Sequence, residues 1–214
     1  MKIVNNKKEA IQELQRISNR TNLENNNKIN LIVAEILDEV KTHGDIAVER
    51  YTQKFDGFNP NPMQVSEDDL KNAWHKLDDS LKRSLKVAHK RIKNFHEREI
   101  PSSFIIEGEH GDKVQRKWRP VKKAGIYIPG GRAAYPSTVL MNAIPAKVAG
   151  VEEIIMVSPG NTEGIINNTV LAAAHLAGIK KVFRIGGAQA VGALAFGTNQ
   201  IDKVDVISGP GNIY

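Results

Sequence analysis

Three short apolar runs of the sequence each end in a glycine-rich turn that carries an isolated polar side chain. Tyr127 lies just before Ile-Pro-Gly-Gly, Gln189 follows Gly-Gly-Ala, and Asn212 follows Gly-Pro-Gly. A tyrosine hydroxyl and the amides of glutamine and asparagine both donate and accept hydrogen bonds, so these groups can orient a neutral polar ligand. They do not exchange protons near neutral pH. The pattern therefore predicts a binding site without its own acid–base chemistry.

The positions of these turns predict that they face one another. Each follows a run of strand length and β character, at residues 124–128, 182–185 and 204–207. Parallel strands present their carboxyl ends at one edge of a sheet, so the three polar side chains are expected to share one crevice. A single glycine turn between strand and helix is a weak signal. Its recurrence after three strands is what favours a site.

The elements that would position these residues alternate regularly from Pro120 onward. We expect Ser137 to be the N-cap of the first helix. The expected order is strand, helix 138–149, strand 153–157, helix 163–177, strand 181–185, helix 188–195 and strand 204–207. Such alternation predicts an α/β fold with a doubly wound parallel sheet, similar to an incomplete Rossmann domain. There is no Gly-x-Gly-x-x-Gly fingerprint, so a dinucleotide would be held by separated contacts from several turns.

The preceding residues have a mainly helical pattern and form part of a first domain, 1–119, with the boundary to an α/β domain, 120–214, placed near Arg119–Pro120. We expect Asp45 to cap the helix that follows Gly44, and Ser66, with Asp69, to open a helical region that reaches about Phe95. A hairpin is predicted over 105–118, with its turn at 108–111. Further helices are expected at 9–17 and 27–40, and the helix after Gly44 is expected to end near Asp56.

Composition excludes several classes of function. The chain has no cysteine, so a disulfide framework, a thiolate metal site and a cysteine nucleophile are absent from these 214 residues. Its formal charge of +6 is spread among acidic residues and forms no basic run with interleaved aromatic residues, which argues against nucleic-acid binding. No segment has the apolar length of a membrane helix or a signal peptide. We therefore expect a cytoplasmic protein that binds neither nucleic acid nor membrane.

The six histidines do not form a metal-ligand pattern. His89 and His96 could share a helix face, but seven residues rise about 10.5 Å, too far for one zinc ion. His175 lies in an alanine-rich segment, where a packing role is favoured over that of a base. There is no His-Glu-x-x-His, no Gly-x-Ser-x-Gly and no phosphate-binding Gly-x-x-x-x-Gly-Lys. No catalytic or metal-binding residue is therefore assigned within the chain.

Five motifs, in this order and spacing, closely resemble the histidinol dehydrogenase family. They are Gly-Ile-Tyr-Ile-Pro-Gly-Gly, Tyr-Pro-Ser-Thr-Val-Leu-Met, Gly-Gly-Ala-Gln-Ala, Ala-Leu-Ala-Phe-Gly-Thr and Gly-Pro-Gly-Asn. The resemblance extends more weakly through the N-terminal part, to Gly44-Asp45 and to Asn94-Phe95-His96-Glu97. It covers essentially the whole chain, although a complete member of the family is about twice as long.

The resemblance implies an activity and cofactors. Histidinol dehydrogenases oxidise L-histidinol to L-histidine through L-histidinaldehyde, with two hydride transfers to NAD and a zinc ion that positions the substrate. By motif, the NAD-contacting residues of the family fall on Tyr127, Gln189 and Asn212. The zinc ligands and the Glu-His acid–base pair of the family follow the Gly-Pro-Gly-Asn motif, and this sequence stops two residues after it. The family also implies a homodimer whose active site draws on both subunits.

Two other functions remain open from the residues. The chain could be a non-catalytic nucleotide-binding module or a truncated product, which retains the fold without the reaction. It could also belong to an aldehyde-oxidising dehydrogenase of another type, whose chemistry needs a cysteine nucleophile. The absence of cysteine counts against the second alternative in this span only.

Overall fold

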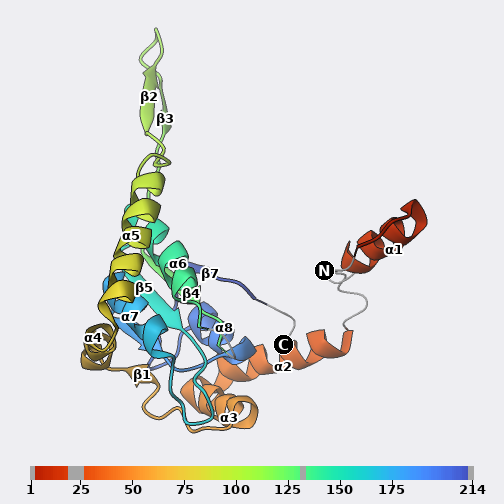
Figure 1. Ribbon diagram of the computed structural model, residues 1–214. Coiled ribbons are helices and arrows are strands. Elements are labelled where there is room, and N and C mark those ends of the chain that lie inside the picture. Colours follow the sequence, from red (N-terminus) through yellow and green to blue (C-terminus); the bar gives the residue numbers. More distant parts are fainter. Residues whose placement is uncertain (1–2, 19–26, 131–133, 212–214) are drawn as a thin grey trace.

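A central sheet with helices on both faces organises the chain in this computed structural model, which describes residues 3–18, 27–130 and 134–211 (Figure 1). Its strands stand in the order β1, β6, β5, β4, β7. Four are mutually parallel, as the sequence predicts: β4 (Lys123–Tyr127), β5 (Glu153–Val157), β6 (Lys181–Phe183) and β7 (Val206–Ser208). The predicted α/β fold with a parallel, doubly wound sheet is confirmed.

The fifth strand comes from the N-terminal region and was not expected. β1 (Gln64–Val65) pairs antiparallel with β6, so that Gln64 lies opposite Phe183. Two residues are too short for a period of two to be recognised in a sequence. Residues before Arg119 thus extend the same sheet that the later residues build.

Side chains that alternate along the strands divide the core into two layers. On β5, Ile154 and Met156 face one layer, whereas Ile155 and Val157 face the other. The first layer is covered by α4 (Glu67–His75), α5 (Asp79–His96), α6 (Pro136–Val148) and α7 (Asn168–Leu176). The second is covered by α2 (Asn27–His43), α3 (Asp45–Asp56) and α8 (Gly187–Phe196). Because both faces are buried, the strands are continuously apolar.

The predicted hairpin is present and projects away from the sheet. β2 (Phe104–Glu107) and β3 (Lys113–Arg116) pair antiparallel beyond the end of α5 (Figure 1). Every residue of the two strands is exposed, including Phe104, Ile105 and Ile106. Near the start of the chain, α1 (Lys7–Ser18) also has no buried residue. None of the helices in the described residues is both long and apolar enough to cross a membrane.

Two predictions about helix ends were wrong. The N-cap of α6 is Tyr135 and not Ser137, because Pro136 occupies the first turn, where its missing N–H is not needed. Asp45 is the first residue of α3 and makes no side-chain cap; Gly44 is the N-cap. The helical region predicted from Ser66 to about Phe95 is confirmed and consists of two helices, since Asp78 accepts a hydrogen bond from the Leu81 N–H and begins α5. The cap by Ser66 is confirmed.

Candidate functional site

The carboxyl ends of the parallel strands meet at one edge of the sheet, where their turns pack tightly. A Cβ atom at Gly186, after β6, would lie 2.6 Å from the Cβ of Pro159, after β5. A Cβ at Gly209, after β7, would overlap the carbonyl oxygen of Tyr127, and its φ of 146° also disfavours other residues. Glycine therefore allows the turns after neighbouring strands to approach closely, while the shared crevice stays a prediction.

Tyr127 is the last residue of β4, and its side chain reaches the turn that begins α8. The Gly187 N–H donates a hydrogen bond to the Tyr127 hydroxyl oxygen at 3.2 Å. Burial raises the pKa of the Tyr127 hydroxyl; the Gly187 hydrogen bond opposes this rise and the nearby Asp56 carboxylate adds to it. The hydroxyl is therefore neutral at physiological pH and keeps its own hydrogen to donate.

Gln189 lies in the first turn of α8, beside the same contact. Its side chain is 1% exposed, yet neither the amide nitrogen nor the amide oxygen has a hydrogen-bond partner among the described residues. A Cβ atom at Gly187 would lie 2.6 Å from the Gln189 amide oxygen, which places this amide against the turn that holds Tyr127. A buried amide without partners costs stability, so its retention indicates a ligand or ordered water at this point.

Asn212, the third residue that the sequence proposes for the site, lies outside the described residues. The strand before it, β7, is held by two contacts. It pairs with β4, and the Ser208 hydroxyl donates a hydrogen bond to the Asn142 side-chain oxygen on α6 at 2.7 Å. The structure thus brings Tyr127 and Gln189 to one turn, and it brings the chain up to Gly211 along the neighbouring strand.

Sequence reasoning missed one charged residue of this region. Asp56 ends α3, and its carboxylate acts electrostatically on the Tyr127 hydroxyl. One of its oxygens is buried without a partner among the described residues, and this burial raises the pKa of the carboxyl. The sequence marked Asp56 only as the end of the helix after Gly44, since its position relative to Tyr127 depends on how α3 packs against α8.

A metal site is absent from the part of the chain that the structure describes. No group of three or more histidine, aspartate or glutamate side chains there could hold an ion. His43 instead lies beside Glu39 on α2, and His96 lies beside Glu99, which follows α5.

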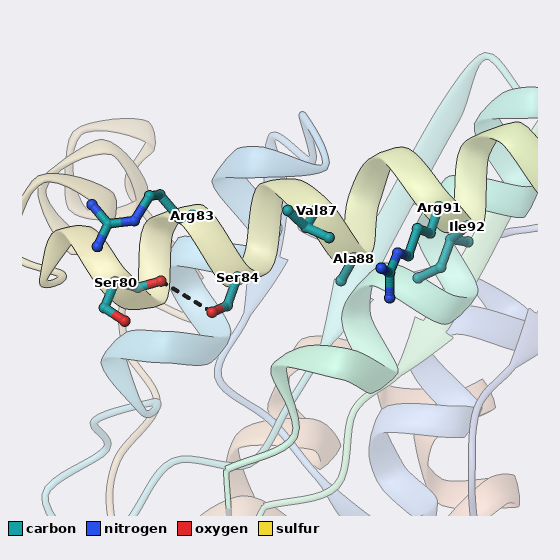
Figure 2. A pocket seen from close by; sticks show the side chains of 7 residues that line it. All are labelled: Ser80, Arg83, Ser84, Val87, Ala88, Arg91 and Ile92. Atoms are coloured by element: carbon teal, nitrogen blue, oxygen red, sulfur yellow. Dashed lines mark hydrogen bonds between the residues drawn. The ribbon is translucent and has the colours of Figure 1, made fainter.

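Two surface hollows lie away from the strand edge. An open groove of about 570 Å³ runs along α5, where Figure 2 shows Arg83 and Arg91 with Val87 between them. A second hollow, of about 330 Å³, lies between α5 and α6 and includes His89, whose pKa is lowered by burial and then by Lys93 and Lys147. Neither hollow is lined by the residues proposed from the sequence.

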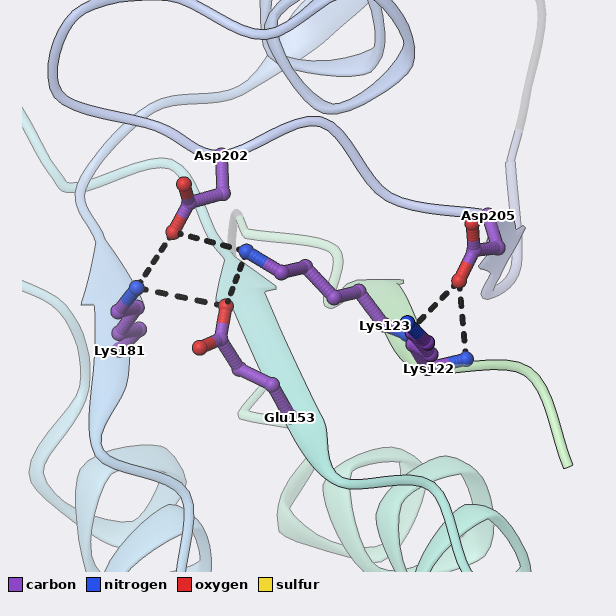
Figure 3. A network of polar contacts seen from close by, with 6 residues as sticks. All are labelled: Lys122, Lys123, Glu153, Lys181, Asp202 and Asp205. Carbon is purple, nitrogen blue, oxygen red and sulfur yellow. Dashed lines mark hydrogen bonds and ion pairs between the residues drawn. The ribbon is translucent and has the colours of Figure 1, made fainter.

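An ion network lies at the opposite, amino-terminal edge of the strands (Figure 3). Lys181 contacts Asp202 at 2.5 Å and Glu153 at 3.3 Å, and Lys123 contacts the same two carboxylates at 3.4 and 3.5 Å. Each charge has partners of opposite sign, so the network joins strand ends and leaves no group free for chemistry.

Comparison with known proteins identifies the chain's relatives. The family model described as histidinol dehydrogenase matches residues 19–214. The chain belongs to the histidinol dehydrogenase family. It is 83% identical over 214 residues to histidinol dehydrogenase from Prochlorococcus marinus strain MIT 9312. This match covers all of this chain and 49% of that protein. The match to histidinol dehydrogenase of Clostridium acetobutylicum is 48% identical over 179 residues, 84% of this chain and 42% of that protein.

A solved structure supports the fold and its extent. The crystal structure of histidinol dehydrogenase from Elizabethkingia anophelis is similar with a TM-score of 0.82 and 40% sequence identity, over 86% of this chain and 42% of that one. This chain therefore spans about half the length of the histidinol dehydrogenases that it matches. The resemblance noted from the five sequence motifs is confirmed at the level of the family.

Proposed function

We propose that this chain is the NAD-binding part of a protein that oxidises L-histidinol to L-histidine through L-histidinaldehyde. Family membership supports the reaction, and the buried, unpartnered amide of Gln189 beside Tyr127 is the observation that supports a ligand at this edge of the sheet. When bound, NAD accepts hydride from the substrate carbon in each of the two oxidation steps. The work of this chain is to bind and orient that cofactor.

The residues present fit a dinucleotide. The Gln189 amide offers both a donor and an acceptor, and the Tyr127 hydroxyl still has a hydrogen to donate after it accepts the Gly187 N–H. Asn212 would add a second amide from the turn after β7. Because glycine turns bring these groups together without intervening side chains, a flat ligand could lie against the backbone. None of the three groups moves a proton at neutral pH, so they hold the cofactor only.

The described residues do not fit a zinc site, so no step is assigned to the metal here. The relatives are about twice as long as this chain. We propose that the zinc ligands, and the groups that accept the protons of the substrate hydroxyls, lie in the part of the protein that corresponds to the rest of that length. A homodimer and a cytoplasmic location are proposed on the same family grounds.

The test uses a full-length protein that contains this chain, with Tyr127→Ala, Gln189→Ala and Asn212→Ala as separate variants. Each lost hydrogen bond should cost about 0.5 to 1.5 kcal/mol, which raises the Michaelis constant for NAD roughly two- to tenfold. Zinc content, measured by metal analysis, should stay stoichiometric. Gln200→Ala is the matched control, because this glutamine is exposed and lies at the far end of α8.

Unchanged Michaelis constants for NAD in all three variants would show that the shared crevice is wrong. A full-length protein that binds NAD but does not oxidise histidinol would instead favour the non-catalytic binding module.

A further inference from the structure

Three polar side chains on one stripe of α3 each have a buried oxygen without a hydrogen-bond partner among the described residues. They are Asp45, Thr52 and Asp56, and the atoms concerned are one carboxylate oxygen of each aspartate and the threonine hydroxyl. Positions separated by seven and eleven residues return to the same face of an α-helix. This helix packs against α8, on which Gln189 is also buried without a partner.

The two helices run in opposite directions, which places Asp56 at the end where Gln189 lies. Gly44, just before α3, lies beside Thr198, just after α8: a Cβ atom at Gly44 would be 3.9 Å from the Thr198 Cβ. Asp56 is eleven residues, roughly 16 Å, further along α3. At that end its charge acts on the Tyr127 hydroxyl. Asp56 therefore lies at the end of the α3–α8 pair where Gly187 joins the Tyr127 hydroxyl and the Gln189 amide.

Asp56 occupies a position that is unfavourable for a carboxylate. It is the last residue of α3, where the helix dipole is negative, and Gly57 follows as a left-handed C-cap. Among the described residues it makes no ion pair, and its buried oxygen has no donor. A carboxylate only accepts hydrogen bonds, so whatever compensates this position must bring hydroxyl or amide donors.

We propose that Asp56 accepts hydrogen bonds from the hydroxyls of the ribose that carries the 2′-phosphate in NADP, and so selects NAD over NADP. The inference rests on the proposed cofactor site. Of the donors on a dinucleotide, a ribose diol presents two neighbouring hydroxyls that match the two oxygens of one carboxylate. A 2′-phosphate would remove one donor and place a second negative charge beside Asp56 in a partly buried place.

The test measures dissociation constants of NAD and NADP by calorimetry for the full-length protein and its Asp56→Asn variant. Asp56→Asn should weaken NAD binding about tenfold, since a hydrogen bond to a charged group is lost, and should leave NADP binding unchanged or tighter. Asp45→Asn is the matched control, because it changes the same group on the same stripe at the end of α3 away from Tyr127. It should leave the ratio of the two constants unaltered.

A second measurement needs no variant. The unaltered protein should bind 2′-deoxy-NAD about tenfold more weakly than NAD. Equal affinity for these two ligands, or an equal change for NAD and NADP in Asp56→Asn, would overturn the inference and leave ordered water as the partner of Asp56. The cofactor site itself is judged separately, because Tyr127→Ala and Gln189→Ala weaken NAD binding if that site is right, whatever Asp56 does.

Discussion

At the scale of single residues, two polar groups at the proposed site contain buried atoms without hydrogen-bond partners among the described residues. Gln189 has a fully buried amide with no partner among the described residues, and Asp56 has a buried carboxylate oxygen in the same situation. Such groups carry a desolvation cost of about 1–3 kcal/mol each unless a ligand or water compensates it. Cofactor binding and the stability of the free protein should therefore respond in opposite directions when these groups are replaced.

Gln189→Met tests this relation, because methionine has a similar shape and no hydrogen-bonding need. We expect the free energy of unfolding without cofactor to stay the same or rise by about 1 kcal/mol, and NAD binding to weaken. Urea unfolding and calorimetric titration measure the two quantities. Gln200→Met, on an exposed position, should change neither. A loss of several kcal/mol in Gln189→Met would mean that its amide already has partners in the free protein.

The sequence identified Gln189 and Tyr127 but could not identify Asp56, for a physical reason. The first two follow strands, and parallel strands bring their carboxyl ends together whatever else the chain does. Asp56 reaches the site only because α3 packs antiparallel to α8, a contact between residues more than 130 positions apart. Its one local signal was an acidic residue at the carboxyl end of a helix, where the dipole disfavours it.

At the scale of elements, two aspartates near the start of the sheet differ in what they hold. Asp202 belongs to the exposed ion network, where its pKa is lowered by the hydrogen bond from Lys181 (Figure 3). Asp205 accepts two backbone hydrogen bonds, from the N–H groups of Lys122 and Lys123, both at 2.9 Å. Asp202 thus joins lysine side chains that are partly exposed to solvent, whereas Asp205 holds the backbone where β4 begins.

We predict that Asp205→Ala lowers the free energy of unfolding more than Asp202→Ala. Loss of charge-assisted bonds to two backbone amides should cost about 1.5–3 kcal/mol, and loss of an exposed ion pair less than about 1 kcal/mol. Urea unfolding at low and high salt separates them further, since only the effect of Asp202→Ala should fade as salt screens the charges. Equal losses at both salt concentrations would contradict this account of the sheet edge.

Element types followed from sequence more readily than their ends did. The apolar runs predicted the four parallel strands, since burial on two faces leaves a readable pattern, and the glycines at 108 and 111 predicted the turn of the hairpin. The N-cap of α6 was misplaced because Pro136 and Ser137 both favour a helix start and the proline position decides. β1 escaped notice because its pairing with β6, and not its own two residues, makes it a strand.

At the scale of the whole molecule, the two cores are complete but several apolar surfaces are not covered. The hairpin and α1 expose large apolar side chains, among them Phe104, Ile106 and Leu14. Elements from both sides of residue 119 share the cores, and the division into domains at 119 and 120 stays a prediction. We expect the purified chain to fold through these cores and to self-associate through exposed patches, which size-exclusion chromatography would reveal.

In the proposed function, this chain binds the cofactor, and the residues for metal binding and proton transfer lie elsewhere in the protein. The most direct measurement is histidinol-dependent NADH formation by the purified 214-residue chain, supplied with NAD and zinc. We expect no turnover, because the residues proposed for the site are neutral polar groups and no group of metal ligands is found among the described residues. Measurable turnover would contradict it and would return His89, His96 and His175 to consideration as zinc ligands.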